Sequence, residues 1–238
     1  MEDRPIPSNP SRIYAIGDIH GRLDLLRRAI DAIRLDTERH GPDAMTVTLG
    51  DYVDRGPASR EVLDLLAGNP FPTPHVALKG NHEAVFEGFL KTGAGGEHWR
   101  KFGGLETLHS YGVPVADVMM GRGYEVAAER LRAAMPDTHR AFLASLRISY
   151  AQGGYFFCHA GVRPGIALAR QNEADLLWIR DDFLGSTVDF GKIIVHGHTP
   201  VEAPDVRPNR INIDTGAFIS GQLTCVALDG SGHRFLKI

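Results

Sequence analysis

The chain has 238 residues, of which 43% are hydrophobic and 23% charged, and its formal net charge at pH 7 is -3. This composition is ordinary for a globular protein, and the charge excludes a general basic field for holding nucleic acid or an anionic membrane. No apolar run approaches the ~18 residues of a membrane-spanning helix. The N-terminal residues lack the features of a secretory signal. Two cysteines are too few for a disulfide framework. We therefore expect a cytoplasmic protein with no nucleic-acid or membrane partner.

The first third of the chain alternates between strand and helix patterns. The β-rich runs cover residues 12–16, 46–49 and 75–78. The glycines that end these runs are Gly17, Gly50 and Gly80. A helical pattern follows each run: the first stops at Gly41, the second is expected to be capped by Ser59, and the third covers about residues 81–91. This order predicts parallel strands whose three following loops converge on one rim, where α/β sheets bind ligands.

The middle of the chain, residues 92–147, breaks this alternation. A glycine-rich loop comes first, and weakly amphipathic helical stretches follow at residues 124–135 and 137–146. With the end of the preceding helix, residues 84–147 are interpreted as a helical cap inserted over the rim. Because no linker flanks it, residues 12–238 are interpreted as a single domain, and residues 1–11 as a loose N-terminal arm.

The last third returns to strand patterns. The expected strands are at residues 148–151, 155–158, 193–196, 211–213, 223–228 and 234–237. Because no clear helical pattern separates them, they predict a second and more antiparallel sheet. The fold class expected is therefore α/β, a four-layer α/β/β/α sandwich of two mixed sheets with the helical cap as an insertion.

Five short motifs at the predicted strand ends contain the residues suited to chemistry. They are Gly17-Asp-Ile-His-Gly21, Gly50-Asp-Tyr-Val-Asp-Arg-Gly56, Gly80-Asn-His-Glu83, His159-Ala-Gly161 and His196-Gly-His-Thr199. Their oxygen and imidazole donors, with no thiolate among them, suit manganese, iron or zinc better than a soft metal. The candidate ligands are Asp18, His20, Asp51, Asn81, His159 and His198. This set is too large for one tetrahedral ion, so we expect two divalent ions, with manganese as the first choice, that share a bridging carboxylate.

A pair of divalent ions keeps a net positive charge beside Asp18 and Asp51, which attracts a phosphate dianion. Two ions ~3.5–4 Å apart can clamp the substrate and lower the pKa of bound water toward ~7, so the expected reaction is in-line attack on phosphorus by a bridging hydroxide. The guanidinium groups of Arg55 and Arg180 are suited to grip phosphate oxygens. His82 is placed to protonate the leaving alkoxide, and Asp54 could hold its tautomer.

Taken together in this order, the motifs resemble the metallophosphoesterase superfamily, and within it the bacterial and phage branch of the phosphoprotein phosphatases. Ile213-Asp-Thr-Gly216 is a further match, so the likeness covers most of the chain. The resemblance implies a calcineurin-like fold. It also implies one metal bound by Asp18, His20 and Asp51, and a second bound by Asp51, Asn81, His159 and His198. His82 and Asp54 are implied as an acid pair, and Arg55, Arg180 and Asn81 as contacts of the phosphate.

The favoured function is that of a serine/threonine protein phosphatase acting on phosphoproteins or phosphopeptides. A symmetrical dinucleoside tetraphosphatase of the same superfamily is the alternative, although that group usually lacks the aspartate seen at Asp54 and has aspartate where this chain has Glu83. A scaffold that binds phosphoproteins without hydrolysis is a more distant hypothesis, since the full set of ligands is retained. The prokaryotic form of the motif at His196 gives no reason to expect eukaryotic regulatory subunits.

Overall fold

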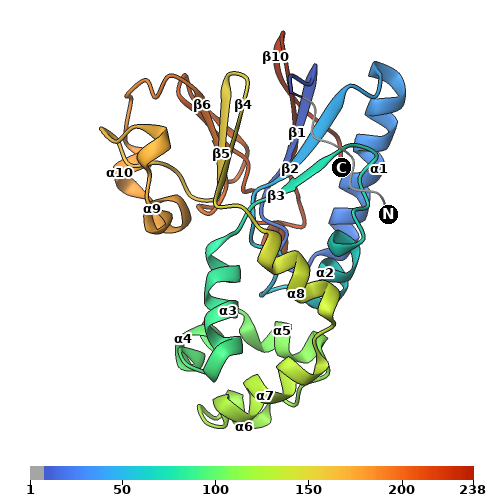
Figure 1. The fold of residues 1–238 in the computed structure, drawn as a ribbon, viewed down its shortest axis with the longest axis vertical. Helices are drawn as coiled ribbons and strands as arrows, with labels where there is room; N and C mark the ends of the chain where they lie inside the picture. Colours follow the sequence, from blue (N-terminus) through green and yellow to red (C-terminus); the bar gives the residue numbers. More distant parts are fainter. Residues whose placement is uncertain (1–7) are drawn as a thin grey trace.

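The computed structural model describes residues 8–238 and contains two five-stranded mixed sheets (Figure 1). The strands of the first sheet are β1 (Arg12–Ile16), β2 (Ala44–Thr48), β3 (His75–Ala77), β9 (Cys225–Asp229) and β10 (Gly232–Phe235). Their order across the sheet is β10-β9-β1-β2-β3. The strands β1, β2 and β3 are parallel, whereas β9 is antiparallel to both of its neighbours.

The second sheet has three parallel strands in its centre and an antiparallel strand at each edge, whereas the antiparallel pairings of the first sheet all lie on one side. Its strands are β4 (Ser149–Gln152), β5 (Tyr155–Cys158), β6 (Ile193–His196), β7 (Asp205–Val206) and β8 (Arg210–Asn212). Their order is β4-β5-β6-β8-β7, in which β5, β6 and β8 are parallel. The edge strands β4 and β7 are antiparallel to β5 and β8.

Helices cover the outer faces of both sheets (Figure 1). The helices α1 (Leu23–His40) and α2 (Ser59–Ala67) lie beside the first sheet, and α9 (Glu173–Trp178) and α10 (Asp181–Leu184) lie beside the second. Along β1, Ile13 and Ala15 face the second sheet, whereas Tyr14 and Ile16 pack toward the helices. Both faces of the strand are therefore buried, and the four-layer α/β/β/α prediction is confirmed. Within residues 8–238, none of the helices combines the length and the apolar composition needed to cross a bilayer.

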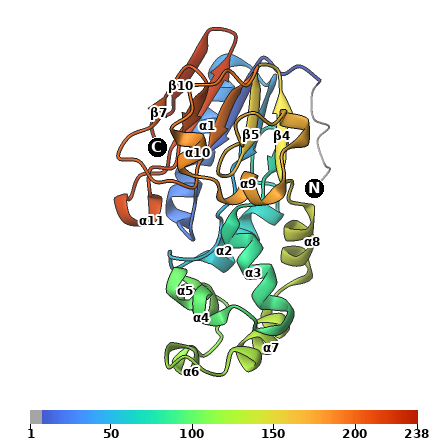
Figure 2. The same cartoon turned by 90° about the vertical axis from the view of Figure 1, so that its left-hand side faces the viewer.

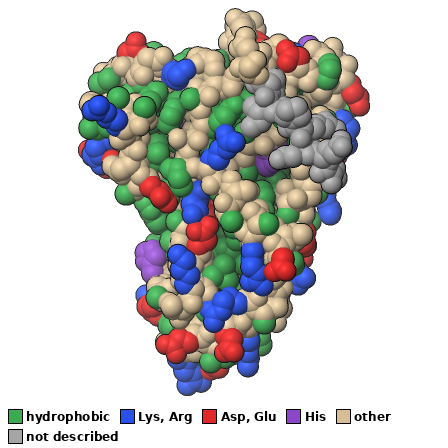
Figure 3. All heavy atoms as spheres, in the orientation of Figure 1, with side chains coloured by type: hydrophobic (Ala, Val, Ile, Leu, Met, Phe, Trp, Pro, Cys, Tyr) green, Lys and Arg blue, Asp and Glu red, His purple; other side chains and the backbone are tan. Residues whose placement is uncertain are grey.

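A helical lobe lies beyond one end of the two sheets (Figure 2). It contains α3 (Asn81–Thr92), α4 (Gly96–Trp99), η1 (Arg100–Phe102), α5 (Gly104–Ser110), α6 (Ala116–Met119), α7 (Tyr124–Ala134) and α8 (Asp137–Ser145). The first of these, α3, starts directly after the loop that follows β3, so the lobe begins at the rim predicted to hold the site. Acidic and basic side chains are interspersed over the lobe and the sheets on the face drawn in Figure 3.

Two expectations about the last third of the chain were wrong. The strands β9 and β10 belong to the first sheet, because β9 pairs with β1 from the opposite end of the chain, and no local sequence pattern signals such a pairing. The second sheet is not more antiparallel than the first, because each has two parallel and two antiparallel pairings, and α9 and α10 form the crossover that makes β5 and β6 parallel. These helices, like η2 (Leu168–Arg170) and α11 (Ala217–Ser220), are too short to show a helical period in the sequence.

Ser59 does not cap α2 as predicted. The residue before the helix is Ala58, which makes no side-chain cap, and the Ser59 hydroxyl instead accepts a hydrogen bond from the backbone N–H of Asp54. At the N-terminus, residues 1–7 of the expected arm lie outside the described residues. Ser8 and Ser11 hydrogen-bond to Gln152 and Asp43, so the end of the arm that adjoins β1 is attached to the sheets.

A buried carboxylate, Asp36 of α1, joins the helix to the first sheet. It accepts hydrogen bonds from the hydroxyl of Tyr14 on β1, at 2.7 Å, and from the guanidinium of Arg234 on β10, and it lies 3.9 Å from Nε of Arg12. Burial raises the pKa of Asp36, but the hydrogen bonds from Arg234 and Tyr14 outweigh burial and hold the pKa below its ordinary value. The carboxylate is therefore ionised at neutral pH and contributes to stability in that form.

We expect Asp36→Asn to lower the free energy of unfolding at pH 7 by roughly 1–3 kcal/mol, because the amide leaves the arginines without an anionic partner. The pKa of Asp36 is lower in the folded than in the unfolded chain. Its contribution is therefore complete above the unfolded value of about 4 and is lost as the pH falls through the folded one. Denaturant unfolding from pH 7 to pH 3 should show the gap between wild type and variant closing in acid. The exposed Asp31, which pairs with Arg34, provides the control Asp31→Asn. A gap that stays constant with pH would contradict this account.

Candidate active site

The loops that follow β1, β2 and β3 meet around Asp51. The backbone N–H groups of Ile19 and His20 both donate to the carbonyl oxygen of Asp51, at 3.0 and 2.8 Å. The backbone N–H of His82, at the start of α3, donates to Oδ1 of Asp51 at 3.0 Å. Backbone hydrogen bonds therefore fix the three loops against one another, and the predicted convergence on one rim is confirmed.

Several side chains at this rim depend on backbone in the left-handed region. The non-glycine residues with positive φ at the site are His20 (45°), Asp51 (52°), Asp54 (71°), Arg55 (69°) and His198 (67°). Such conformations are unfavourable for residues other than glycine and persist only where the surrounding structure imposes them. Their concentration here indicates that the surrounding structure holds the site in this geometry, although the backbone conformations are unfavourable.

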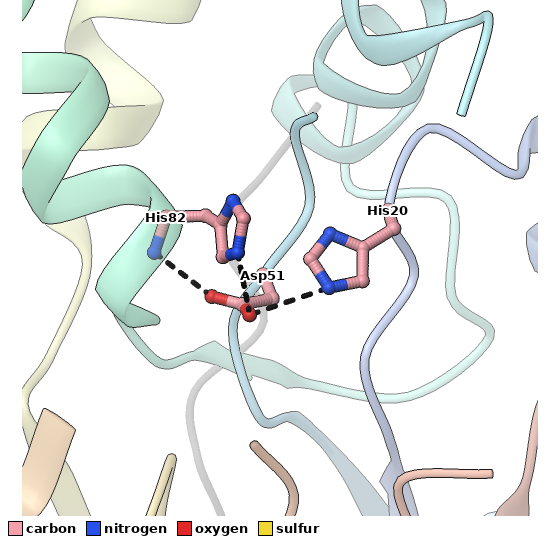
Figure 4. A group of neighbouring side chains, drawn as sticks. All are labelled: His20, Asp51 and His82. Atoms are coloured by element: carbon pink, nitrogen blue, oxygen red, sulfur yellow. Dashed lines mark hydrogen bonds and ion pairs between the residues drawn. The ribbon is translucent and has the colours of Figure 1, made fainter. Parts of the chain in front are cut away.

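His20, Asp51 and His82 form the first group of possible metal donors, and Figure 4 shows the Asp51 carboxylate between the two imidazoles. Nδ1 of His20 donates to the carbonyl of Val53 at 2.9 Å, which leaves the lone pair on Nε2, 3.4 Å from Oδ2 of Asp51. Burial lowers the pKa of His20 to about 3, so the ring is neutral at pH 7. A neutral imidazole with its lone pair on Nε2 is the form that binds a metal ion.

Asp18, Asp51 and His159 form the second group, so Asp51 is common to both. Nδ1 of His159 donates to the carbonyl of Leu49 at 3.0 Å, and its Nε2 lies 2.7 Å from Oδ1 of Asn81 and 3.4 Å from Oδ1 of Asp51. Nδ1 of His198 lies 2.8 Å from the same oxygen of Asn81. The structure therefore brings together all of the residues predicted as metal ligands.

The donor atoms fit divalent cations. Burial lowers the pKa of His159, so the ring is neutral and its Nε2 carries a lone pair. This lone pair points at the oxygens of Asn81 and Asp51. Acceptor atoms that face one another in this way repel unless a cation lies among them. Oδ1 of Asp18 and Nε2 of His198 are buried without a hydrogen-bond partner. Nitrogen and oxygen donors without a thiolate suit a borderline or hard divalent ion, and they do not identify the element.

The buried carboxylates also favour bound cations. Burial raises the pKa of Asp18 well above its ordinary value, and the negative charges of Asp214 and Asp51 raise it further. The carboxyl of Asp214, which lies in the motif Ile213-Asp-Thr-Gly216, is itself buried beside Asp18. Buried anions this close together are costly unless positive charge compensates them.

The two residues of the predicted acid pair, His82 and Asp54, lie within hydrogen-bonding distance of each other. Nδ1 of His82 lies 2.7 Å from Oδ2 of Asp54, and its Nε2 points toward Oδ2 of Asp51, 3.9 Å away. Because His82 also belongs to the first group of possible metal donors, its position is compatible with either role. Asp54 lies deeper than the rim and is fully buried.

The two predicted phosphate contacts differ in their placement. Arg55 lies at the rim, where Nη1 is 3.0 Å from Nε2 of His20 and the guanidinium stacks on the ring of Phe218 with a separation of 4.7 Å. Arg180 is exposed and lies farther out, where it donates to the hydroxyl of Thr199 at 3.2 Å. The structure therefore places Arg55 at the donor cluster and Arg180 at its edge.

Glu83 is a site residue that the sequence analysis noted only as a family difference. Its buried carboxylate accepts hydrogen bonds from the backbone N–H groups of Asp51, Tyr52 and Gly80, at 2.7 to 2.9 Å. It thereby joins the loop that carries Asp51 to the first turn of α3. The signal in the sequence was its position three residues after Gly80, at the start of a helix, where a glutamate often satisfies free backbone N–H groups.

A side chain at Gly197 would displace a predicted ligand, because its Cβ would lie 2.0 Å from Oδ1 of Asp18. We expect Gly197→Ala to reduce the bound metal and to lower phosphatase activity roughly 10–100-fold, as changes next to metal ligands commonly do. Metal analysis of the manganese-loaded protein and its rate on nitrophenyl phosphate provide the measurements. At Gly154 a Cβ has nothing within 4 Å, so Gly154→Ala is the matched control. Full metal content and rate in Gly197→Ala would refute the placement of Asp18.

Comparison with known proteins agrees with the fold and with the family that the motifs resemble. The family model described as calcineurin-like phosphoesterase matches residues 11–220. The chain is 26% identical to the asymmetrical bis(5'-nucleosyl)-tetraphosphatase PrpE of Halalkalibacterium halodurans, over 89% of this chain and 87% of that protein. It is 28% identical to serine/threonine-protein phosphatase 2 of Salmonella typhimurium, over 89% and 90%. The solved structure of a candidate diadenosine tetraphosphatase has the same fold, with a TM-score of 0.65 and 19% identity over 97% of this chain and 95% of that one.

Two mixed sheets that carry a shared rim of aspartate, asparagine and histidine define a metal-dependent hydrolase of phosphate esters, a metallophosphoesterase. The chain belongs to the calcineurin-like phosphoesterase family, whose model covers most of its length. The resemblance seen in the sequence motifs is therefore confirmed, and the family together with the donor cluster implies divalent metal ions.

Proposed function

We propose that this protein hydrolyses phosphate monoesters, with phosphoserine and phosphothreonine in proteins as its main substrates. The observation that carries the proposal is the convergence of two groups of metal donors on Asp51, with His82 and Arg55 beside them. The likeness to a serine/threonine-protein phosphatase over most of both chains supports the choice of substrate class. The Glu83 and Asp54 positions support it too, since both are filled as in that class.

Two divalent ions would be held by the six donors already described, with Asp51 shared between them. When bound, such ions supply positive charge that attracts the phosphate dianion and makes bound water more acidic. Neighbouring backbone groups hold two of the donors in position: the carbonyls of Val53 and Leu49 fix the orientation of His20 and His159. Partners of this kind on the second ring nitrogen are usual for metal-binding histidines.

Arg55 and His82 would have different roles toward the phosphate ester. The Arg55 guanidinium is braced by Phe218 and His20, so its N–H groups can be presented to phosphate oxygens without a large loss of side-chain entropy. His82 has Nδ1 fixed by Asp54, which leaves Nε2 as the atom that can pass a proton to the leaving oxygen. Arg180 would reach the phosphate only from the edge of the site, and its contribution should be the smaller of the two arginines.

A dinucleoside tetraphosphatase is the second candidate, and the relative in Halalkalibacterium halodurans favours it. That relative is named as an asymmetrical enzyme, whereas the sequence analysis considered the symmetrical type. Exposed aromatic side chains also favour this candidate: Trp178 and Phe102, each 44% exposed, line a small pocket with Asn81 and His82. Rings in this position could stack on a nucleobase.

A substrate panel tests the proposed function. The manganese-loaded protein should release phosphate from phosphoserine and phosphothreonine peptides with a higher kcat/KM than it shows for diadenosine tetraphosphate. The reverse ranking would favour the dinucleoside tetraphosphatase. Failure to turn over any phosphate ester with manganese, iron or zinc, despite full metal content, would favour the scaffold hypothesis.

Two substitutions separate metal binding from proton transfer. We expect Asp51→Asn to lower metal content and rate together, because both donor groups lose their shared carboxylate. We expect His82→Asn to retain the metal and to slow phosphoserine hydrolysis by about 100-fold or more, the usual contribution of a general acid. Nitrophenyl phosphate, whose leaving group needs little protonation, should lose far less activity. Loss of metal from His82→Asn would instead make His82 a ligand.

A further inference from the structure

We propose that Trp99 and Thr107 of the helical lobe are positioning residues for the acid pair, because they fix the carboxylate of Asp54 that orients His82. The inference rests on the proposed function in one respect, namely that His82 protonates the leaving group. It gives the lobe a part in the reaction that acts through Asp54.

The Asp54 carboxylate has three side-chain donors. Oδ2 accepts from Nδ1 of His82 at 2.7 Å and from Nε1 of Trp99 at 2.9 Å. Oδ1 accepts from the hydroxyl of Thr107 at 2.6 Å. The same hydroxyl oxygen accepts from the backbone N–H of Asp54 at 2.9 Å, so Thr107 holds the residue at both its backbone and its side chain.

Packing fixes the Trp99 indole. The side chain is fully buried, and its ring lies 4.3 Å from that of Phe89 and 5.7 Å from that of Phe86, both on α3. On the other side Gly104 packs so closely that a Cβ there would lie 2.4 Å from the indole. The indole therefore has little freedom to turn, and its N–H is held toward Asp54.

Fixing the carboxylate matters because His82 could otherwise form its hydrogen bond with either oxygen of Asp54. With Oδ1 bound by Thr107 and Oδ2 by Trp99, the carboxylate plane is set, and the imidazole can meet Oδ2 in one orientation only. The lobe also contacts the neighbouring phosphate-binding residue, since the backbone N–H of Arg55 donates to the carbonyl of Gly103 at 3.2 Å. The segment from Trp99 to Thr107 thus supports the acid pair and Arg55 from the same side.

A merely structural role for these residues would lower stability and affect all substrates equally, so the test compares leaving groups. Trp99→Phe removes the indole N–H and keeps a ring, and Thr107→Val removes the hydroxyl at nearly constant volume. Each variant, loaded with manganese, is assayed on a phosphoserine peptide and on nitrophenyl phosphate, together with its metal content and melting temperature. We expect kcat on the phosphopeptide to fall about tenfold, a fraction of the full general-acid effect, with KM, metal content and the aryl rate within about threefold of wild type.

Two controls accompany the variants. Thr107→Ser keeps the hydroxyl and should restore the phosphopeptide rate. Tyr111→Phe removes a different buried hydroxyl of the lobe, one that bonds to His139 and does not touch Asp54, and should leave the ratio of the two rates unchanged.

Equal loss on both substrates, or no loss on either, would overturn the inference while leaving the proposed function intact. A wild-type protein that is inactive on both substrates would overturn the proposed function and this inference with it. If Trp99→Phe does not fold, the outcome for Thr107→Val decides the question alone.

Discussion

The site depends on one buried carboxylate that is shared between two groups of donors. Asp51 lies within 3.4 Å of a nitrogen of His20 on one side and of His159 on the other, and it does so with its backbone in the left-handed region. Isolated anions and facing lone pairs of this kind are costly in a protein interior. Bound cations would therefore compensate the negative charge of the site. Backbone hydrogen bonds between the loops hold the donors in place against their mutual repulsion.

Those hydrogen bonds come from a second layer of residues. Glu83 holds the loop that carries Asp51, the carbonyls of Leu49 and Val53 orient the imidazoles, and the lobe holds Asp54. None of these groups needs to touch substrate. Preorganised groups act without reorganising during the reaction, so rigidity here translates into transition-state stabilisation.

The sequence predicted the parts of the molecule that follow local rules. The strands β1, β2 and β3 were recognised as short β-rich runs, and the polar residues directly after them were correctly placed at one rim. The pairing of β9 with β1 and the contact of Trp99 with Asp54 were not predictable in this way, because each joins residues distant along the chain through packing alone.

Both sheets contribute donors to the site, and this has a consequence for how the two sheets are held together. Asp18, Asp51 and Asn81 follow strands of the first sheet, whereas His159 and His198 follow β5 and β6 of the second. Cations held by both sets would link the two sheets to each other. Metal binding would therefore serve both the reaction and the contact between the two sheets. In a protein without its ions, we expect local opening to begin at the active site.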